Sequence, residues 1–388
     1  MARLVRSAAA LAAGALLLAA APAGLAAQER SAFVVRLGSD TTAVERAVRT
    51  TQRLEGDLLV RTPRTQVIHY VATLDGQGRV TRFEASSPAT AAAPAQRSVL
   101  TFGDSVRMEL VRGDSTRRVA LAVPAGAVAT PMLPTSFALY DQLLRVARRL
   151  PGDSARVALV FPGAREPSVA AVVRRGRDSV TVDFFGSPFL ASVGSAGELR
   201  GLSGRETTLK VEVARVDDAP VERLAQEFAA RDAAGQSMGQ LSPRDTVRAT
   251  VAGAELLVDY GRPAKRGRQI WGGIVPWGEV WRTGANAATQ LRTSRDLVFG
   301  DVTVPAGTYT LWTLPTAGGA QLIVNRQTGQ WGTAYDASQD LARVPLRPAT
   351  PAAPAERFTI SVEPGQGRGG VLRMVWDDRG WEIPFTVR

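Results

Sequence analysis

The chain has 388 residues, a formal net charge of +11 at pH 7 and no cysteine. Without cysteine it can hold no disulfide, thiolate nucleophile, cysteine-ligated metal or lipid-modified cysteine. Its 47 Lys and Arg residues are almost all arginine, spread along the chain among 36 Asp and Glu residues. Because no long basic block occurs, we expect no nucleic-acid partner.

Residues 1–27 are typical of an export signal. Two arginines precede an apolar Ala/Leu stretch from residue 8 to about 21, and small residues follow. That order indicates a signal peptide cleaved between Ala23 and Gln28, with an uncleaved anchor as the alternative. We therefore expect an extracytoplasmic protein, periplasmic or secreted, with no transmembrane anchor after signal removal.

Residues 28–231 are predicted to form an antiparallel β-meander domain. Apolar residues alternate in 66–74 and 79–85 around Asp75-Gly76, which is typical of a hairpin, and the pattern recurs further along. Two helices interrupt it, one capped by Ser136 and ending near residue 150, the other opened by Pro220 and ending near residue 230. We expect a curved sheet that wraps around the first helix.

Residues 232–245 have lost apolar periodicity and are predicted to be a linker. Residues 246–388 contain many short alternating segments separated by turns and almost no helical pattern. This part is predicted to be a β-sandwich, so the whole chain is expected to be mostly β. The predicted strands are 246–251, 255–260, 289–293, 297–304, 308–314, 321–325, 341–346, 358–362, 371–376 and 381–387.

All seven tryptophans lie in the last third of the chain, three of them in the Arg- and Gly-rich run 260–286. This run is too irregular for a helix or strand and predicts a long ordered loop. Its arginines either bond to loop carbonyls and carboxylates while Trp271 and Trp281 plug the sandwich, or converge on a cleft where Trp277 stacks on a ligand. The candidate ligand-binding residues are Arg262, Lys265, Arg268, Trp277, Trp281, Arg282 and Asn286.

Several short segments in and after this run form a recognisable pattern. They are YGRP at 260–263, KRGR at 265–268, IVPWG at 274–278, WRTGAN at 281–286, VPAGTY at 304–309, Asn325, GQWG at 329–332, Tyr335-Asp336, and Asp340 with Arg343. Together they resemble a secreted bacterial family known as domain of unknown function 2911. The resemblance extends over about 246–387, with small departures at Gly261 and Trp277, and it implies no established activity. The N-terminal half is not recognised.

Few residues of the sequence are candidates for a catalytic role. His69 is the only histidine and lies on a predicted strand of the N-terminal half, so neither a Ser-His-acid triad nor a histidine-ligated metal is expected beyond the linker. Asp259 and Glu279 flank the signature loop and are weak candidates for a carboxylate pair.

We therefore expect an exported, non-enzymatic binding protein, with no cofactor and no metal, that engages a small molecule, glycan or protein through loop 260–286. The first alternative is an extracytoplasmic carbohydrate-active hydrolase that uses carboxylates. The second is an N-terminal domain that carries an apolar ligand around its helix.

Overall fold

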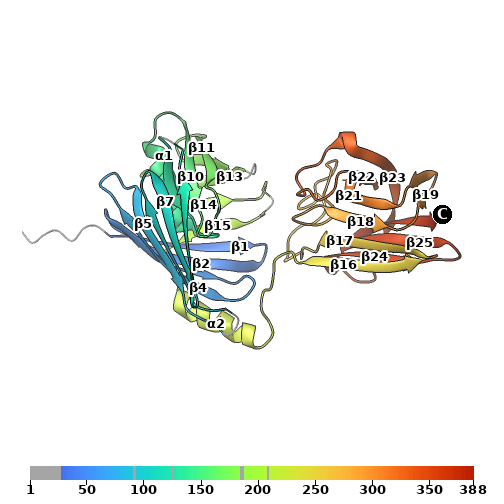
Figure 1. The fold of residues 1–388 in the computed structure, drawn as a ribbon, viewed down its shortest axis with the longest axis horizontal. Helices are drawn as coiled ribbons and strands as arrows, with labels where there is room; N and C mark the ends of the chain where they lie inside the picture. Colours follow the sequence, from blue (N-terminus) through green and yellow to red (C-terminus); the bar gives the residue numbers. More distant parts are fainter. Residues whose placement is uncertain (1–27, 91–92, 125, 184–187, 208) are drawn as a thin grey trace, which may run out of the picture.

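The computed structural model describes residues 28–388, except 91–92, 125, 184–187 and 208. The predicted export signal lies outside the described residues. Within them the chain is mostly β, in two sheets with two α-helices, as predicted (Figure 1). Neither helix of the described part is long and apolar enough to cross a membrane.

The N-terminal sheet is one fifteen-stranded sheet. Its order is β8-β7-β6-β5-β4-β3-β2-β1-β15-β14-β13-β12-β11-β10-β9. Sequence neighbours lie side by side except β8 and β9, which form the two edges, and β1 pairs with β15 at the middle. Described pairs are antiparallel except β9 with β10, which confirms the predicted meander. The strands are β1 (Glu29–Leu37), β2 (Asp40–Arg49), β3 (Arg53–Val60), β4 (Gln66–Leu74), β5 (Val80–Ser87), β6 (Gln96–Phe102), β7 (Ser105–Arg112), β8 (Ser115–Ala122), β9 (Val128–Pro131), β10 (Ser154–Val160), β11 (Ser168–Arg174), β12 (Ser179–Asp183), β13 (Pro188–Val193), β14 (Leu199–Ser203) and β15 (Glu212–Val216).

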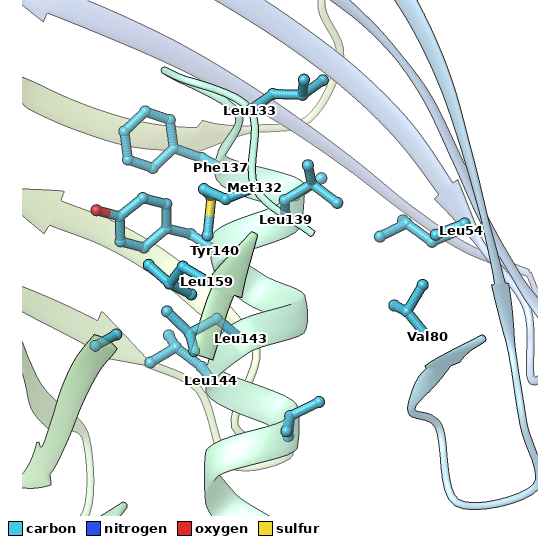
Figure 2. Packing of buried hydrophobic residues seen from close by; sticks show 14 of the residues in the cluster. Leu54, Val80, Met132, Leu133, Phe137, Leu139, Tyr140, Leu143, Leu144 and Leu159 are labelled. Atoms are coloured by element: carbon cyan, nitrogen blue, oxygen red, sulfur yellow. The ribbon is translucent and has the colours of Figure 1, made fainter. Parts of the chain in front are cut away.

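Helix α1 (Phe137–Arg149) lies inside the curve of this sheet (Figure 1). The predicted cap is correct, since the Ser136 hydroxyl accepts a hydrogen bond from the backbone N–H of Leu139. Its apolar face packs into the main N-terminal core, where Figure 2 shows Leu139 on the side of the helix toward Leu54 and Val80. The helix therefore fills the sheet's concave face.

A buried carboxylate joins α1 to the sheet. Glu45, on β2, is completely buried and accepts hydrogen bonds from the hydroxyls of Tyr70 and Ser136 and from the backbone N–H groups of Phe137 and Ala138. Burial raises the pKa of Glu45, and the four donors offset part of that effect. The carboxylate satisfies free N–H groups at the helix start and so fixes the helix against the sheet.

Helix α2 (Val221–Ala233) covers the outer face instead, where Val221 and Phe228 pack beside Leu59 of β3. Pro220 precedes it, as predicted. The helix continues to Ala233 and β16 begins at Arg244, so the connecting segment is 234–243, shorter at both ends than the predicted linker.

The C-terminal sheet is eleven-stranded, and nearly closed because β24 lies against β16. Its main order is β16-β17-β18-β21-β22-β23-β26-β19-β20, with β24 and β25 continuing from β26, which gives two layers around one core. The strands are β16 (Arg244–Val251), β17 (Ala254–Gly261), β18 (Thr289–Thr293), β19 (Leu297–Phe299), β20 (Val302–Val304), β21 (Gly307–Thr316), β22 (Gly319–Asn325), β23 (Asp340–Ala349), β24 (Ala355–Pro364), β25 (Gly369–Asp377) and β26 (Arg379–Val387).

The prediction of one continuous strand over 297–304 was wrong. The segment 297–304 is a hairpin of β19 and β20, because Gly300 adopts a positive φ of 63° and reverses the chain. A short 3-10 turn, η1 (Ala337–Gln339), precedes β23.

Candidate functional site

A pocket with a volume of about 330 Å³ lies where the segment between β17 and β18 meets the N-terminal half. Four of the seven predicted ligand-binding residues line it: Arg268, Trp281, Arg282 and Asn286. The N-terminal half contributes the end of β1 and the segment between β14 and β15. Further lining comes from the connecting segment, from the turn after β22 and from β25.

Direct contacts hold the two halves together beside this pocket. The backbone N–H of Ser39 donates to the carbonyl oxygen of Arg266 over 2.9 Å, and the Arg266 guanidinium forms an ion pair with Asp40. Gly38 packs so closely on Arg266 and Arg268 that a side chain there would collide with both. These contacts hold the loop against the turn between β1 and β2.

Arg282 has an unusual environment for a cation. Its Nη1 atom is buried without a hydrogen-bond partner, and the described residues offer its guanidinium no ion pair. Burial lowers the pKa of Arg282, with no carboxylate to oppose it. A buried charge is ordinarily paired, and a guanidinium with unused N–H groups in a pocket wall has the hydrogen-bonding capacity for an anion.

The backbone that carries Arg282 is held in a strained conformation. The next residue, Thr283, is fully buried at a φ of 51°, which is rare for a β-branched residue. Its carbonyl accepts from the Thr289 hydroxyl over 2.6 Å, and Trp281 exchanges two backbone hydrogen bonds with Thr313 of β21. Such strain persists only where surrounding contacts impose it, and it is concentrated at functional sites.

The pocket contains two further cations. Arg268 donates to the carbonyl oxygens of Ala264 and Lys265, and Lys210 donates to the carbonyl oxygen of Arg205. Neither forms an ion pair with a carboxylate in the described part of the chain. Burial lowers the pKa of Lys210, and the positive charges of Arg282 and Arg268 lower it further, against the opposing effect of Glu206.

The remaining walls combine apolar and polar side chains. Trp281 stacks on Trp376 with ring centroids 6.1 Å apart, and both indoles line the pocket. Asn286 adopts a positive φ of 63°, and its amide donates to the carbonyl oxygen of Ser242 in the connecting segment. The other apolar side chains of the lining are Leu37, Leu209, Leu241, Pro263, Ile274 and Val280, and its hydroxyl-bearing residues are Thr207, Ser242 and Thr333.

Two of the other predicted residues make structural contacts away from the pocket lining. Arg262 pairs with Asp245 and also donates to Thr359 and to the carbonyl oxygen of Phe358. Lys265 forms a 2.6 Å ion pair with Asp377, which raises the pKa of the lysine. These contacts fasten the loop to β16, β24 and β25.

Trp277 also lies outside the pocket lining. It stacks on Trp271 at 6.1 Å, and the Arg379 guanidinium lies 5.8 Å from its ring. Trp271 in turn meets Trp381 edge to face and belongs to the core. Contacts within the protein therefore account for Trp277, and the predicted plugging of the sandwich by Trp271 and Trp281 agrees with their burial.

The carboxylate candidates do not meet in the pocket. Asp259, on β17, forms a 2.6 Å ion pair with Arg244, and Glu279 is exposed in the loop. Neither lines the pocket. His69 is exposed on β4, where it contacts Asp57 and Glu55, as its sequence pattern predicted. Among the described residues no cluster of three or more potential ligands could hold a metal ion.

The sequence did not reveal the N-terminal side of the pocket. Glu206, Leu209 and Lys210 lie in a turn between two strands, where polar residues are ordinary. Gly332 was part of the family resemblance, and it lies so close to the Arg282 side chain that a methyl group there would overlap its Cδ. No local pattern links these positions to the loop, since they meet only through the fold.

The fold and the pocket define a β-rich protein of two sheets with a cation-lined cavity between them. Residues 242–385 match the family described as "Protein of unknown function (DUF2911)", which confirms the resemblance found in that part of the sequence, and no family matches the N-terminal half. No curated protein matches the chain. A solved structure of a DUF1089 family protein from Pseudomonas aeruginosa is 15% identical, with a TM-score of 0.31, over 42% of this chain and 90% of that chain.

Proposed function

We infer that the protein is an exported, non-enzymatic binding protein that holds a small ligand in the pocket beside loop 260–286. The observation that carries this inference is Arg282, which lines the pocket and whose Nη1 atom is buried without a hydrogen-bond partner among the described residues. A volume of about 330 Å³ lies at the lower end of the range of about 300–1,000 Å³ for small-molecule sites. Apolar walls with a few converging polar groups are the usual composition of such sites.

Binding can be tested by thermal unfolding with a panel of sugars, carboxylates and phosphate esters. We expect at least one class to raise the Tm of the wild-type protein and to leave that of Arg282→Met unchanged, because only a ligand that binds the folded state shifts its stability. A panel that shifts both proteins equally, or neither, contradicts the proposed site.

Export is tested separately. Expression of the full chain in a bacterial host with a periplasm should give a mature protein that begins between Ala23 and Gln28, recovered from the periplasmic fraction or the medium. A cytoplasmic product that retains residue 1 contradicts export.

The hydrolase alternative has less support. Asp259 is engaged with Arg244, and the pocket is lined by neither Asp259 nor Glu279, whereas hydrolysis by a carboxylate pair requires both to flank one bond. Replacing Asp259 and Glu279 with Asn and Gln should leave ligand affinity unchanged. Turnover of an aryl glycoside that these variants abolish would restore the alternative.

A second candidate function rests on a cavity inside the N-terminal half. About 460 Å³ lies at the end of α1, and its lining residues include Leu144, Ala147, Val172 and Val180 together with three arginines, Arg148, Arg174 and Arg177. Such a site suits an apolar ligand with an acidic group. Mass spectrometry of the purified protein tests it: co-purified lipid supports a carrier role, and lipid-free protein speaks against it.

A further inference from the structure

We propose that the ligand has an anionic head, a carboxylate or phosphate group, attached to a compact apolar body, and that Arg282 and Lys210 hold the head from the two halves of the chain. This inference rests on the proposed binding function and specifies its ligand. A ligand bound in this way would connect the N-terminal and C-terminal halves of the chain through its head group.

The charge of the pocket supports an anionic head. Three cations line it, Lys210, Arg268 and Arg282, against one carboxylate, Glu206, which is exposed. Cations gathered in partly buried positions repel one another and lose hydration, both of which destabilise the protein. An incoming anion would reverse both effects, and guanidinium groups suit carboxylate and phosphate because two N–H groups can donate in parallel.

The three cations are not equally available. Arg268 uses two nitrogen atoms on backbone carbonyls, so its first role is to hold the loop. Lys210 keeps two of its three donor hydrogens after its bond to the carbonyl oxygen of Arg205. Arg282 makes no hydrogen bond to any described residue. Arg282 and Lys210 are therefore the groups with free capacity.

The shape and lining of the pocket define the rest of the ligand. The walls formed by Trp281, Trp376, Ile274 and Val280 offer apolar surface rather than further charge. A free inorganic anion would leave this surface in contact with water, whereas an aromatic or short aliphatic body would cover it. A pocket of about 330 Å³ accommodates a body about the size of a single ring with its substituents.

The two halves contribute different donors. Lys210 precedes β15 of the N-terminal sheet, and Arg282 lies in the segment after β17 of the C-terminal sheet. A head group bound to both would add charged hydrogen bonds across this boundary, next to the existing pair of Arg266 with Asp40. The ligand would then hold the N-terminal half on the loop.

Four probes separate the parts of this proposal: phenyl phosphate, benzoate, inorganic phosphate, and benzamide as an uncharged analogue. Binding to the full chain is followed by titration calorimetry. The chain supplies matched controls, since Lys265 is its only other lysine and Arg262 is an arginine of the same loop, both bonded outside the pocket. The variants are Arg282→Met, Lys210→Met, Arg262→Met and Lys265→Met, with Lys210→Gln as a milder form.

We expect phenyl phosphate or benzoate to bind the wild-type protein, and whichever is tighter identifies the head group. Loss of either donor should weaken that binding about tenfold or more, because each removes a charged hydrogen bond. The two control variants should bind within about twofold of wild type. Benzamide and inorganic phosphate should each bind more weakly than the anion with a ring.

Contrary outcomes overturn separate claims. If Arg282→Met loses binding while Lys210→Met and Lys210→Gln keep it, the head group is not held from both halves, and the proposed binding function survives. Benzamide bound as tightly as benzoate refutes the anionic head, and inorganic phosphate bound as tightly as phenyl phosphate refutes the apolar body. Wild-type affinity in both Arg282→Met and Lys210→Met refutes both the role of these two residues in holding the head group and the proposed site.

Discussion

Replacing Arg282 with Met is expected to stabilise the ligand-free protein. The Nη1 atom of Arg282 is buried with no partner among the described residues, and its stem packs against Gly332. Met retains an unbranched apolar stem of similar length and removes the buried charge. A buried donor without a partner costs about 1–3 kcal/mol, more when it is charged, whereas an apolar replacement of similar shape is neutral or stabilising.

We expect the free energy of unfolding to rise by about 1–2 kcal/mol, the lower part of that range because Arg282 as a whole is only partly buried. For a unit of about 150 residues each kcal/mol changes the Tm by roughly 2–4 °C, so the expected rise is about 2–8 °C. Thermal unfolding followed by circular dichroism in a buffer free of carboxylates and phosphate measures it.

The matched control is Arg262→Met in the same loop. It removes an ion pair with Asp245 and hydrogen bonds to Thr359 and the carbonyl oxygen of Phe358, so we expect a loss of about 1–2 kcal/mol. A rise in the free energy of unfolding for Arg282→Met and a fall for Arg262→Met would distinguish a ligand-binding arginine from a structural one. If Arg282→Met lowers the Tm as much as Arg262→Met, then Arg282 stabilises the fold and the reasoning fails.

Three further predictions concern the buried carboxylate, the loop and the pocket lysine. Glu45→Gln should cost about 2–4 kcal/mol in urea unfolding, because one amide cannot accept the bonds that Ser136 and the other donors make to the carboxylate; an unchanged midpoint would contradict this. Gly261→Ala should cost about 1–3 kcal/mol, since its methyl group would collide with the carbonyl oxygen of Ala285, and a wild-type Tm would show that the loop is not packed on β17. The pKa of Lys210 is lowered in the free protein, so affinity for benzoate should begin to fall at a pH below the ordinary lysine value of 10.5 and continue to fall as pH rises; Lys210→Met should lack this dependence, and a parallel decline in both would assign it elsewhere.

The sequence predicted what is encoded locally. Alternating residues on both sides of Asp75-Gly76 defined β4 and β5, and Ser136 marked the start of α1, because hairpin turns and caps are set by near neighbours. The predicted strand 297–304 was instead divided by Gly300 into β19 and β20. Turn geometry at a single residue decided that outcome.

The sequence predicted the part of the candidate site that lies in the loop and missed the part contributed by the N-terminal half. Composition singled out the loop that carries Arg268 and Arg282, but the same composition also fits arginines that fasten the loop, as Arg262 does. Burial without a partner distinguishes Arg282, and only the structure reports it. Lys210 was missed because residues about seventy positions apart meet through the arrangement of two sheets, which leaves no periodic trace in either segment.

We propose that Arg282 and Lys210 bind one anion together, which a crystal structure of the full mature chain with phenyl phosphate would show. Phosphate oxygens should lie within hydrogen-bond distance of both Arg282 Nη1 and Lys210 Nζ, with the ring against Trp281. A structure in which Arg282 is bonded to a carboxylate or carbonyl of the protein, and the phosphate is absent from the pocket, would contradict it.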